Sequence, residues 1–290
     1  MIILRIQRNC GQGNQMYMYS RAYALARKTN QKIIIYSESD LWTFKDRPYI
    51  LDKFKLDKDY IKKVIRIDKI KIRFLAKIIR KILTFYYTHY PNCYNYEEEP
   101  GKDRVYNEID NLNYKNYYLH GFFESYKYFS DYREELISQF EPNFKIDEET
   151  LDVFNKIKTC NSVALHIRRG DFVELGRSIS TNYYKKMISK IEKRIESPIF
   201  YLATTDKNVI DEFSNYNNVK IIDTQNSNKD ITDWLCLKYC KYHMITTSTY
   251  SWWAAYLSND ADKIVFHPSF EEYEKFENKH NKQEYNDFYF

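Results

Sequence analysis

The chain has 290 residues, 43% hydrophobic and 29% charged, which is enough for one large domain or two smaller ones with full cores. A net charge of +5 at pH 7 does not indicate a polycationic nucleic-acid binder, and no apolar run is long enough to span a bilayer. The five cysteines are scattered and lack zinc-site spacing, so we expect a reduced, cytoplasmic protein.

A βαβ unit is predicted at the start of the chain. Residues 2–6 and 32–36 form its predicted strands, and apolar residues recur at helical spacing between them. The turn before the helix contains Gly11 and Gly13 but lacks the third glycine of a dinucleotide-binding fingerprint. Its backbone amides could bind a phosphate at the helix N-terminus, and the polar side chains that follow could bind sugar hydroxyls. The alternative is a plain tight turn.

Residues 53–83 form a strongly basic segment with 12 Lys or Arg and 3 Asp or Glu. Apolar residues recur in it every four positions, at Ile70, Phe74, Ile78 and Ile82. This pattern predicts a helix with one apolar face and cationic flanks. Such a helix can lie on an anionic membrane, and the alternative is an ordinary domain helix with a solvated basic face. We therefore predict a basic helical insertion at about residues 53–90.

The middle of the chain leads to a predicted domain boundary near residues 142–160. Its predicted elements are a loop over residues 89–101, a strand over 117–120, and helices over 126–140 and 148–158. Two domains follow from this boundary, residues 1–150 and residues 151–290.

Strands and helices alternate regularly in the second half. The predicted strands lie near residues 162–167, 198–203, 219–222, 242–246 and 263–266, and the predicted helices near 183–196, 206–213, 230–240 and 250–258. Strands separated by single helices indicate parallel βαβ units. This half is therefore predicted to be a Rossmann-like, nucleotide-binding domain.

Three of these predicted strands end in polar residues. The sequences that follow them are His166-Ile167-Arg168-Arg169-Gly170-Asp171, Thr204-Thr205-Asp206 and Thr246-Thr247-Ser248-Thr249-Tyr250-Ser251. Two adjacent guanidinium groups suit a diphosphate, although an Arg-Arg pair can also be solvated surface. Hydroxyls at a helix start can bind phosphate or simply cap the helix. Because ligands bind at the carboxyl ends of parallel strands, we expect the three segments to meet at one site for a phosphorylated ligand.

Four stretches together resemble the bacterial α-1,2-fucosyltransferases of glycosyltransferase family 11. They are Gly11-Gln12-Gly13-Asn14-Gln15-Met16, Gly121-Phe122-Phe123-Glu124-Ser125, His166-Ile167-Arg168-Arg169-Gly170-Asp171 and Ser248-Thr249-Tyr250-Ser251-Trp252-Trp253-Ala254-Ala255. The likeness spans nearly the whole chain in the right order. The third stretch is shared with other fucosyltransferase families, and the fourth is the more specific.

The resemblance implies a GT-B-like α/β fold, with two Rossmann-like domains facing across a cleft. Residues 1–150 would be the acceptor-side domain, and residues 151–290 the GDP-fucose-binding domain with a C-terminal helical tail. The implied reaction is inverting transfer of L-fucose from GDP-β-L-fucose to the 2-hydroxyl of a terminal galactoside, in a surface glycan or O-antigen precursor. We expect this acceptor to be carried on a lipid at the inner face of the plasma membrane, with peripheral contact between the protein and anionic lipid. No nucleic-acid partner is expected.

The resemblance also implies roles for particular residues. Arg168 would stabilise the charge on the departing GDP, and Asp171 would take the acceptor's proton or orient Arg168, with Glu174 as a further candidate base. The expected donor-binding residues are His166, Arg168, Arg169, Asp206, Ser248, Thr249 and Ser251. Gly11 and Gly13 form the expected phosphate loop, and Asn14 and Gln15 the expected acceptor contacts.

No metal is expected, because arginines can neutralise the diphosphate and the two Asp-x-Asp sequences, Asp57–Asp59 and Asp260–Asp262, do not follow apolar strands. The chain departs from the family at Met18, where a glutamine is usual, and at Thr204-Thr205-Asp206, where Ser-Asp-Asp is usual. These departures concern acceptor choice and nucleotide contacts. The alternatives are another GT-B nucleotide-sugar transferase and a non-catalytic nucleotide- or carbohydrate-binding module.

Overall fold

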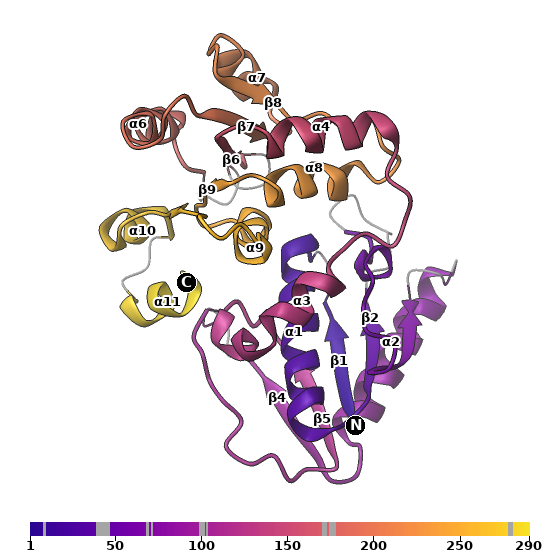
Figure 1. Cartoon of the computed structure of the whole chain (residues 1–290). Coiled ribbons are helices and arrows are strands. Elements are labelled where there is room, and N and C mark those ends of the chain that lie inside the picture. Colours follow the sequence, from indigo (N-terminus) through magenta and orange to yellow (C-terminus); the bar gives the residue numbers. More distant parts are fainter. Residues whose placement is uncertain are drawn as a thin grey trace. The chain divides into compact units, whose positions relative to one another are not determined.

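The computed structural model describes residues 1–290 except 8–9, 39–46, 68–69, 71, 99–101, 103, 170–172, 174–177 and 278–280. Contacts within it divide the chain into two compact units (Figure 1). Unit 1 consists of Met1–Asn143 and Gln283–Phe290, and unit 2 of Phe144–Lys282. Each unit contains a five-stranded sheet in which the strands pair in parallel. The prediction of two Rossmann-like halves is confirmed.

The sheet of unit 1 has the strand order β3-β2-β1-β5-β4. Its strands are β1 (Ile2–Ile6), β2 (Ile33–Ser37), β3 (Ile61–Arg66), β4 (Cys93–Glu97) and β5 (Asn116–His120). The helices and 3-10 turns are α1 (Gln12–Thr29), η1 (Leu51–Lys53), α2 (Arg73–Thr88), η3 (Tyr126–Tyr128), η4 (Ser130–Tyr132), α3 (Arg133–Gln139) and α11 (Lys282–Phe288). The predicted opening βαβ unit is therefore present.

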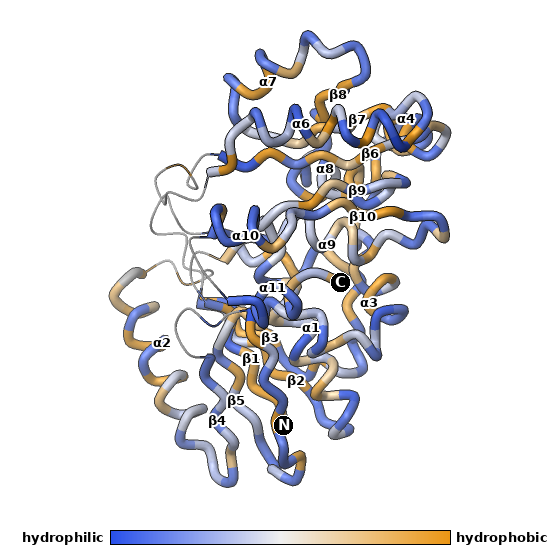
Figure 2. The backbone as a smooth tube through the Cα atoms, turned by 90° about the vertical axis from the view of Figure 1, so that its left-hand side faces the viewer, coloured by the Kyte–Doolittle hydropathy of each residue, from blue (hydrophilic) through white to orange (hydrophobic). Residues whose placement is uncertain are grey.

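The core of unit 1 lies on both sides of its central strands. The apolar residues of β1 and β2 are buried on both faces, and the tube in Figure 2 is coloured hydrophobic along them. Helix α1 is buried from Gln15 through Ala26, because aromatic residues pack on the side away from the sheet. Tyr17 lies 5.8 Å from Phe129, and Tyr19 lies 5.9 Å from Phe140, between ring centroids.

Three predictions for unit 1 are wrong in detail. The basic segment is not one helical insertion, because β3 within it pairs with β2 at the sheet edge and only α2 is helical. The predicted loop at 89–101 contains β4, which pairs with β5. The predicted helix over 126–140 begins only at Arg133, after two 3-10 turns.

The sheet of unit 2 has the strand order β10-β9-β6-β7-β8. Its strands are β6 (Ser162–His166), β7 (Ile199–Ala203), β8 (Val219–Ile221), β9 (Tyr242–Met244) and β10 (Val265–Phe266). The helices are α4 (Glu148–Lys158), α6 (Thr181–Glu192), α7 (Lys207–Phe213), α8 (Lys229–Lys238), α9 (Thr249–Leu257) and α10 (Phe270–Glu277). The predicted alternation of strands and helices is confirmed.

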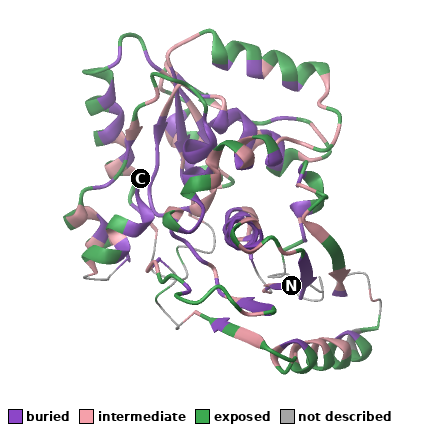
Figure 3. Cartoon of the chain, turned by 60° about the horizontal axis from the view of Figure 1, so that its bottom comes forward, coloured by how far each residue is buried: buried purple, intermediate pink, exposed green. Residues whose placement is uncertain are grey.

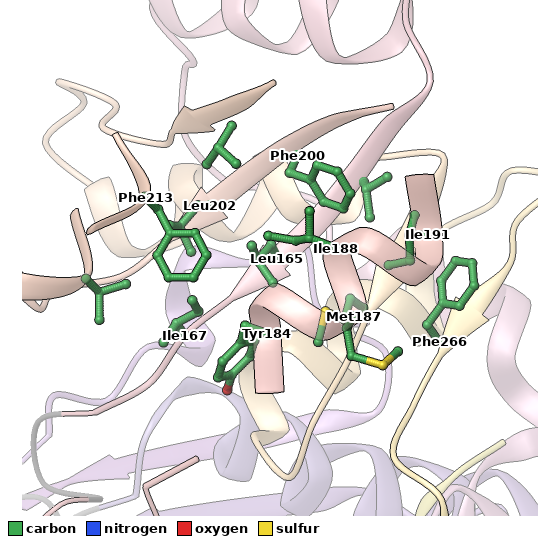
Figure 4. Packing of buried hydrophobic residues seen from close by; sticks show 14 of the residues in the cluster. Leu165, Ile167, Tyr184, Met187, Ile188, Ile191, Phe200, Leu202, Phe213 and Phe266 are labelled. Atoms are coloured by element: carbon green, nitrogen blue, oxygen red, sulfur yellow. The ribbon is translucent and has the colours of Figure 1, made fainter. Parts of the chain in front are cut away.

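Helix α6 covers one face of this sheet. Its apolar side chains pack with Leu165 and Leu202 from the two central strands and with Phe213 from α7 (Figure 4). In Figure 3 the central strands of the unit are coloured as buried and the outer turns of its helices as exposed. Val163, Leu165 and Phe200 have no exposed surface, so β6 and β7 form a rigid base for the segments that leave their ends.

The division of the chain differs from the predicted domain limits at both ends of unit 2. The unit begins at Phe144, inside the predicted boundary region of residues 142–160 and seven residues before the predicted start at residue 151, because α4 packs with α8 in unit 2. The C-terminal tail, predicted to belong wholly to the second domain, returns to unit 1 at Gln283. There the Asp287 carboxylate accepts hydrogen bonds from the Tyr106 amide and the Lys127 ammonium group.

Candidate functional site

The three predicted polar segments leave neighbouring strands of unit 2 at the same edge. β6 lies between β9 and β7, and Leu165 is in register with Met244, as His166 is with Ala203. The polar residues that follow each strand therefore lie beside one another. The three predicted strand ends are thus neighbours at one edge of the sheet, and two arginines follow the middle strand, β6.

Arg169 connects two of the three segments. Its Nε lies 3.5 Å from Oδ2 of Asp206, while Oδ1 of Asp206 accepts hydrogen bonds from the amides of Asn208 and Val209 at the start of α7. Asp206 is thus a helix cap and an arginine partner, whereas we expected a donor contact. Arg168, the preceding residue, is half-buried. A diphosphate at this edge would lie beside two adjacent arginines, of which Arg169 is braced by a carboxylate.

His166, at the end of β6, is an uncharged group in this site. Its ring packs against Tyr250 with 4.9 Å between centroids, and its Nδ1 is buried with no hydrogen-bond partner among the described residues. Burial, together with the positive charge of Arg168, lowers the pKa of His166 to about 3. The imidazole is therefore neutral at pH 7. It can position a ligand, while the arginines bind the ligand's negative charge.

Sequence reasoning did not assign a role to Tyr250. Its hydroxyl donates to the carbonyl oxygen of Asp230 at 2.7 Å, and its ring holds His166. The available signal was its place directly after Thr249, in the hydroxyl-rich segment that follows β9. Tyr250 fixes the position of one expected donor contact.

The N-terminus of α9 has the features of an anion site. Ser248 is its N-cap, but the side chain makes no capping hydrogen bond, and its buried Oγ has no partner within the described part of the chain. Ser251 Oγ instead donates to the Ser248 carbonyl at 3.2 Å. The first amides of the helix and the Ser248 hydroxyl could together hold a phosphate. Thr249, also expected at this site, is the first residue of the helix.

The Trp252-Trp253 pair that makes this stretch specific is structural. Both side chains are completely buried, with ring centroids 5.1 Å apart, and Trp252 stacks on Tyr256 at 4.7 Å. Trp234 of α8 donates its indole N–H to the Tyr250 carbonyl at 3.1 Å. These aromatic residues attach α9 to α8, so they set where the helix N-terminus lies. Asp171 and Glu174, the candidate bases, lie outside the described residues.

The turn before α1 contains the two glycines and the two polar residues that the sequence singled out. Gly11 is the N-cap position of α1, and a Cβ added there would meet no atom within 4 Å. Gly13 is buried and Asn14 half-buried. Gln15 was predicted to contact the acceptor. It is buried instead, and its amide group bonds the backbone of Cys10, Pro48 and Ile50. Gln15 therefore holds the chain beside the turn.

Sequence reasoning also missed a titratable cluster at the carboxyl edge of unit 1's sheet. Arg5 pairs with buried Glu38 at 3.0 Å, and its guanidinium lies 3.4 Å from Nδ1 of His120. The same Nδ1 lies 2.8 Å from the Glu97 carboxylate, which favours the Nδ1–H tautomer and leaves Nε2 as an acceptor. Burial, with Arg5 nearby, lowers the pKa of His120. The His120 imidazole is therefore neutral and can accept a proton.

The Gly121-to-Ser125 stretch is explained by packing around β5. A Cβ on Gly121 would lie 2.6 Å from the Glu98 carboxylate, which accepts hydrogen bonds from the Phe122 and Phe123 amides. Glu124 forms a buried ion pair with Arg104 at 3.0 Å. The close approach of Glu98 thus requires glycine at position 121.

No metal-binding cluster of three or more His, Cys, Asp or Glu occurs in the described part of the chain. Each Asp-x-Asp sequence is a local turn, because the second amide donates to the first carboxylate at 2.9 Å. Among the described residues, no helix combines the length and the apolar composition needed to cross a bilayer.

Comparison with known proteins agrees with this arrangement. The model of Glycosyl transferase family 11 matches residues 3–288. The O-antigen biosynthesis glycosyltransferase WbnK of Escherichia coli is 27% identical, over 89% of this chain and 91% of WbnK. An alpha-1,2-colitosyltransferase of Escherichia coli is 28% identical, over 86% of this chain and 85% of that enzyme.

Solved structures extend the comparison to the fold. The fucosyltransferase NodZ from Bradyrhizobium superposes with a TM-score of 0.52 at 13% identity, over 88% of this chain and 91% of NodZ. The predicted GT-B-like α/β fold is confirmed by this likeness. With the family match covering nearly the whole length, the chain belongs to glycosyltransferase family 11 and is a glycosyltransferase.

Proposed function

We propose that this enzyme transfers L-fucose from GDP-β-L-fucose to the 2-hydroxyl of a terminal galactoside in a surface glycan or O-antigen precursor, with inversion. The observation that carries the proposal is the juxtaposition at one edge of unit 2's sheet of Arg168, Arg169 and the N-terminus of α9. This is a site for a diphosphate. The family and the O-antigen and α-1,2 relatives supply the reaction class, and NodZ has been solved after soaking with GDP-fucose.

Departure of GDP is the step that the arginines assist. The bond between the fucosyl carbon and the β-phosphate oxygen breaks, and its electron pair leaves with GDP. Arg168 stabilises the developing charge, and Arg169, braced by Asp206, supports it. The amides and hydroxyls at Ser248, Thr249 and Ser251 hold the phosphates. Neutral His166 contacts the nucleoside.

The acceptor oxygen forms the new bond and must lose its proton. Asp171 is our proposed acceptor of that proton. Asn14 contacts the acceptor sugar, and Gly11 and Gly13 are the proposed phosphate loop. No metal is required, because the arginines neutralise the diphosphate.

A colitosyl group in place of fucose is the second candidate for the transferred sugar. The observation that favours it is the alpha-1,2-colitosyltransferase relative, which covers 86% of this chain. The two candidates share the diphosphate site and differ in the sugar.

Release of GDP from GDP-fucose, with and without a galactoside, tests the proposal. We expect release to be stimulated by the galactoside and to be unchanged by EDTA. The product's linkage is then read by nuclear magnetic resonance. Release only from a colitosyl donor would select the second candidate. Loss of activity in EDTA that Mg²⁺ restores would contradict metal independence, and no release from either donor with any galactoside would overturn the proposal.

Variants assign the roles. Arg168→Ala should lower kcat by about 100-fold or more, as expected when a group that stabilises transition-state charge is lost. Arg194→Ala, which removes an exposed arginine after α6, is the matched control and should leave kcat unchanged. Asp171→Asn tests the base, because loss of the true base removes the acidic limb of the pH–kcat profile. Near-normal turnover by Arg168→Ala would refute its role.

A further inference from the structure

Helix α2 exposes an apolar surface that unit 1 does not cover. We call this surface, made of Phe74, Leu75, Ile78, Ile82, Phe85 and Tyr86, the α2 apolar face. These side chains are 37% to 72% exposed, and they make up half of the large exposed hydrophobic residues in the described part of the chain. Figure 2 shows the helix alternating between hydrophobic and hydrophilic segments. Contiguous exposed apolar surface of this kind marks an interaction site.

The helix packs on unit 1 through a different side. Ala76 and Tyr87 are buried and Leu83 is partly buried against the core that includes Ile3 and Tyr36. The sequence pattern predicted that Ile70, Phe74, Ile78 and Ile82, spaced four positions apart, would form the single apolar face. Ile70 precedes the helix and packs partly in the core, but the other three members point to solvent. The apolar surface of α2 thus extends beyond the side chains that pack in the core of unit 1.

Helical geometry shows how wide it is. A helix turns about 100° per residue, so Phe74, Phe85, Ile78 and Ile82 fall within roughly 80° of arc. The face continues past the C-terminus of the helix into a pocket of about 780 Å³. Ile82, Phe85 and Tyr86 line it together with His89, Tyr90 and Pro91. The exposed surface is therefore continuous along the helix and around its end.

The charged residues of the chain segment that carries this face are all basic. Residues 69–90 contain six lysines and arginines and no acidic residue. Exposed Lys77 and Lys81 fall on the same side of the helix, next to Phe74 by helical position. This is the arrangement by which an interfacial helix inserts its apolar side chains below the headgroups and keeps its cations at anionic lipid. Cations beside an exposed apolar face favour a surface that combines apolar and anionic groups, as an anionic lipid membrane does.

We propose that α2 docks unit 1 on an anionic membrane surface, with the α2 apolar face buried among the lipids and the lysines of its border at the headgroups. The helix lies in the plane of the interface. The enzyme is thereby held where lipid-carried substrates are found. This inference stands on the helix alone and does not depend on which sugar is transferred.

Vesicle sedimentation with the full chain, without donor or acceptor, tests the docking. We expect binding to phosphatidylcholine vesicles that contain phosphatidylglycerol and much weaker binding to phosphatidylcholine alone. The triple variant Phe74→Ser, Ile82→Ser, Phe85→Ser should weaken binding at least about tenfold, because three inserting side chains are lost. Lys77→Gln with Lys81→Gln should weaken it roughly tenfold or more, and added salt should weaken the wild type.

Matched surface changes supply the controls. Leu112→Ser, Leu151→Ser and Ile264→Ser remove three side chains of 39%, 44% and 47% exposure elsewhere, and Lys190→Gln with Lys193→Gln removes two exposed lysines. Both control proteins should bind as the wild type does, and circular dichroism should show all variants folded. Failure of the wild type to bind anionic vesicles overturns the proposal. So does equal weakening by the controls, or concentration-dependent dimerisation through α2 in sedimentation velocity without vesicle binding.

Discussion

His243 lies on β9, between β10 and β6, and has no exposed surface. Burial, with the charge of Lys263 nearby, lowers its pKa from 6.5 to about 3. Below pH 6.5 the unfolded chain therefore binds a proton that the folded chain does not. The stability that neutral His243 contributes is fully present above pH 6.5 and is lost as the pH falls toward 3. Between pH 7 and pH 5 we expect this group to lower the free energy of unfolding by roughly 2 kcal/mol.

Urea unfolding at the two pH values measures this loss. His243→Leu removes the titrating group and should remove its share of the difference, while His89→Leu, at an exposed histidine, should keep the wild-type difference. An unchanged pH dependence in His243→Leu would show that another group is responsible. His166 should add a second contribution of the same sign, because its pKa is also lowered to about 3.

Residue positions were predictable from sequence where local patterns decide them. The arginines after β6 and the hydroxyls before α9 could be found because their places at strand ends follow from the apolar pattern. Gln15 could not be assigned, because its partners include Pro48 and Ile50, far along the chain. The cluster of Arg5, Glu38 and His120 was missed for the same reason: strands distant in sequence bring it together.

The helix starts of α7 and α9 differ in how their caps are used. Asp206 bonds two amides of α7, whereas Ser248 makes no side-chain cap bond. Asp206→Ala should therefore lower the free energy of unfolding by about 1 kcal/mol, the usual cost of losing a cap. Ser248→Ala should leave stability within about 0.5 kcal/mol of the wild type but weaken GDP binding several-fold.

Thermal unfolding and isothermal titration with GDP separate the two effects. Ser269→Ala, on the N-terminal side of α10, is a control for loss of a hydroxyl that bonds the Glu272 amide, and it should not change GDP affinity. If Ser248→Ala lowered stability as much as Asp206→Ala and left GDP affinity unchanged, the α9 terminus would be a structural cap and not a phosphate site.

The elements that sequence patterns missed are those at the edges of unit 1's sheet. β3 carries two adjacent lysines that are exposed, so its composition is that of a surface segment. β4 has half-buried Tyr94 and buried Tyr96 on either side of exposed Asn95, and it has no long apolar run. An edge strand buries less than a central strand, and its sequence carries a correspondingly weaker signal. Central strands such as β6 were predictable because both of their faces are buried.

At the scale of the whole molecule, the parallel sheets were predictable and the path of the chain between units was not. Alternating strands and helices permit few other topologies. Nothing local distinguishes α11 from an ordinary C-terminal helix of the second domain. Its assignment to unit 1 depends on long-range contacts, including Arg104, whose guanidinium lies 4.0 Å from the Phe288 ring centroid.

The returning tail should therefore stabilise unit 1. Phe288 has no exposed surface, so Phe288→Ala should lower the free energy of unfolding by about 3 to 5 kcal/mol. Hydrogen exchange should rise around residues 104–128, where the tail contacts the chain, because Asp287 holds both Tyr106 and Lys127. Exchange in β6 and β7 should change little. Asn286→Ala, at an exposed position of the same helix, should alter neither quantity. Faster exchange confined to unit 2 would show that the tail stabilises the second unit instead.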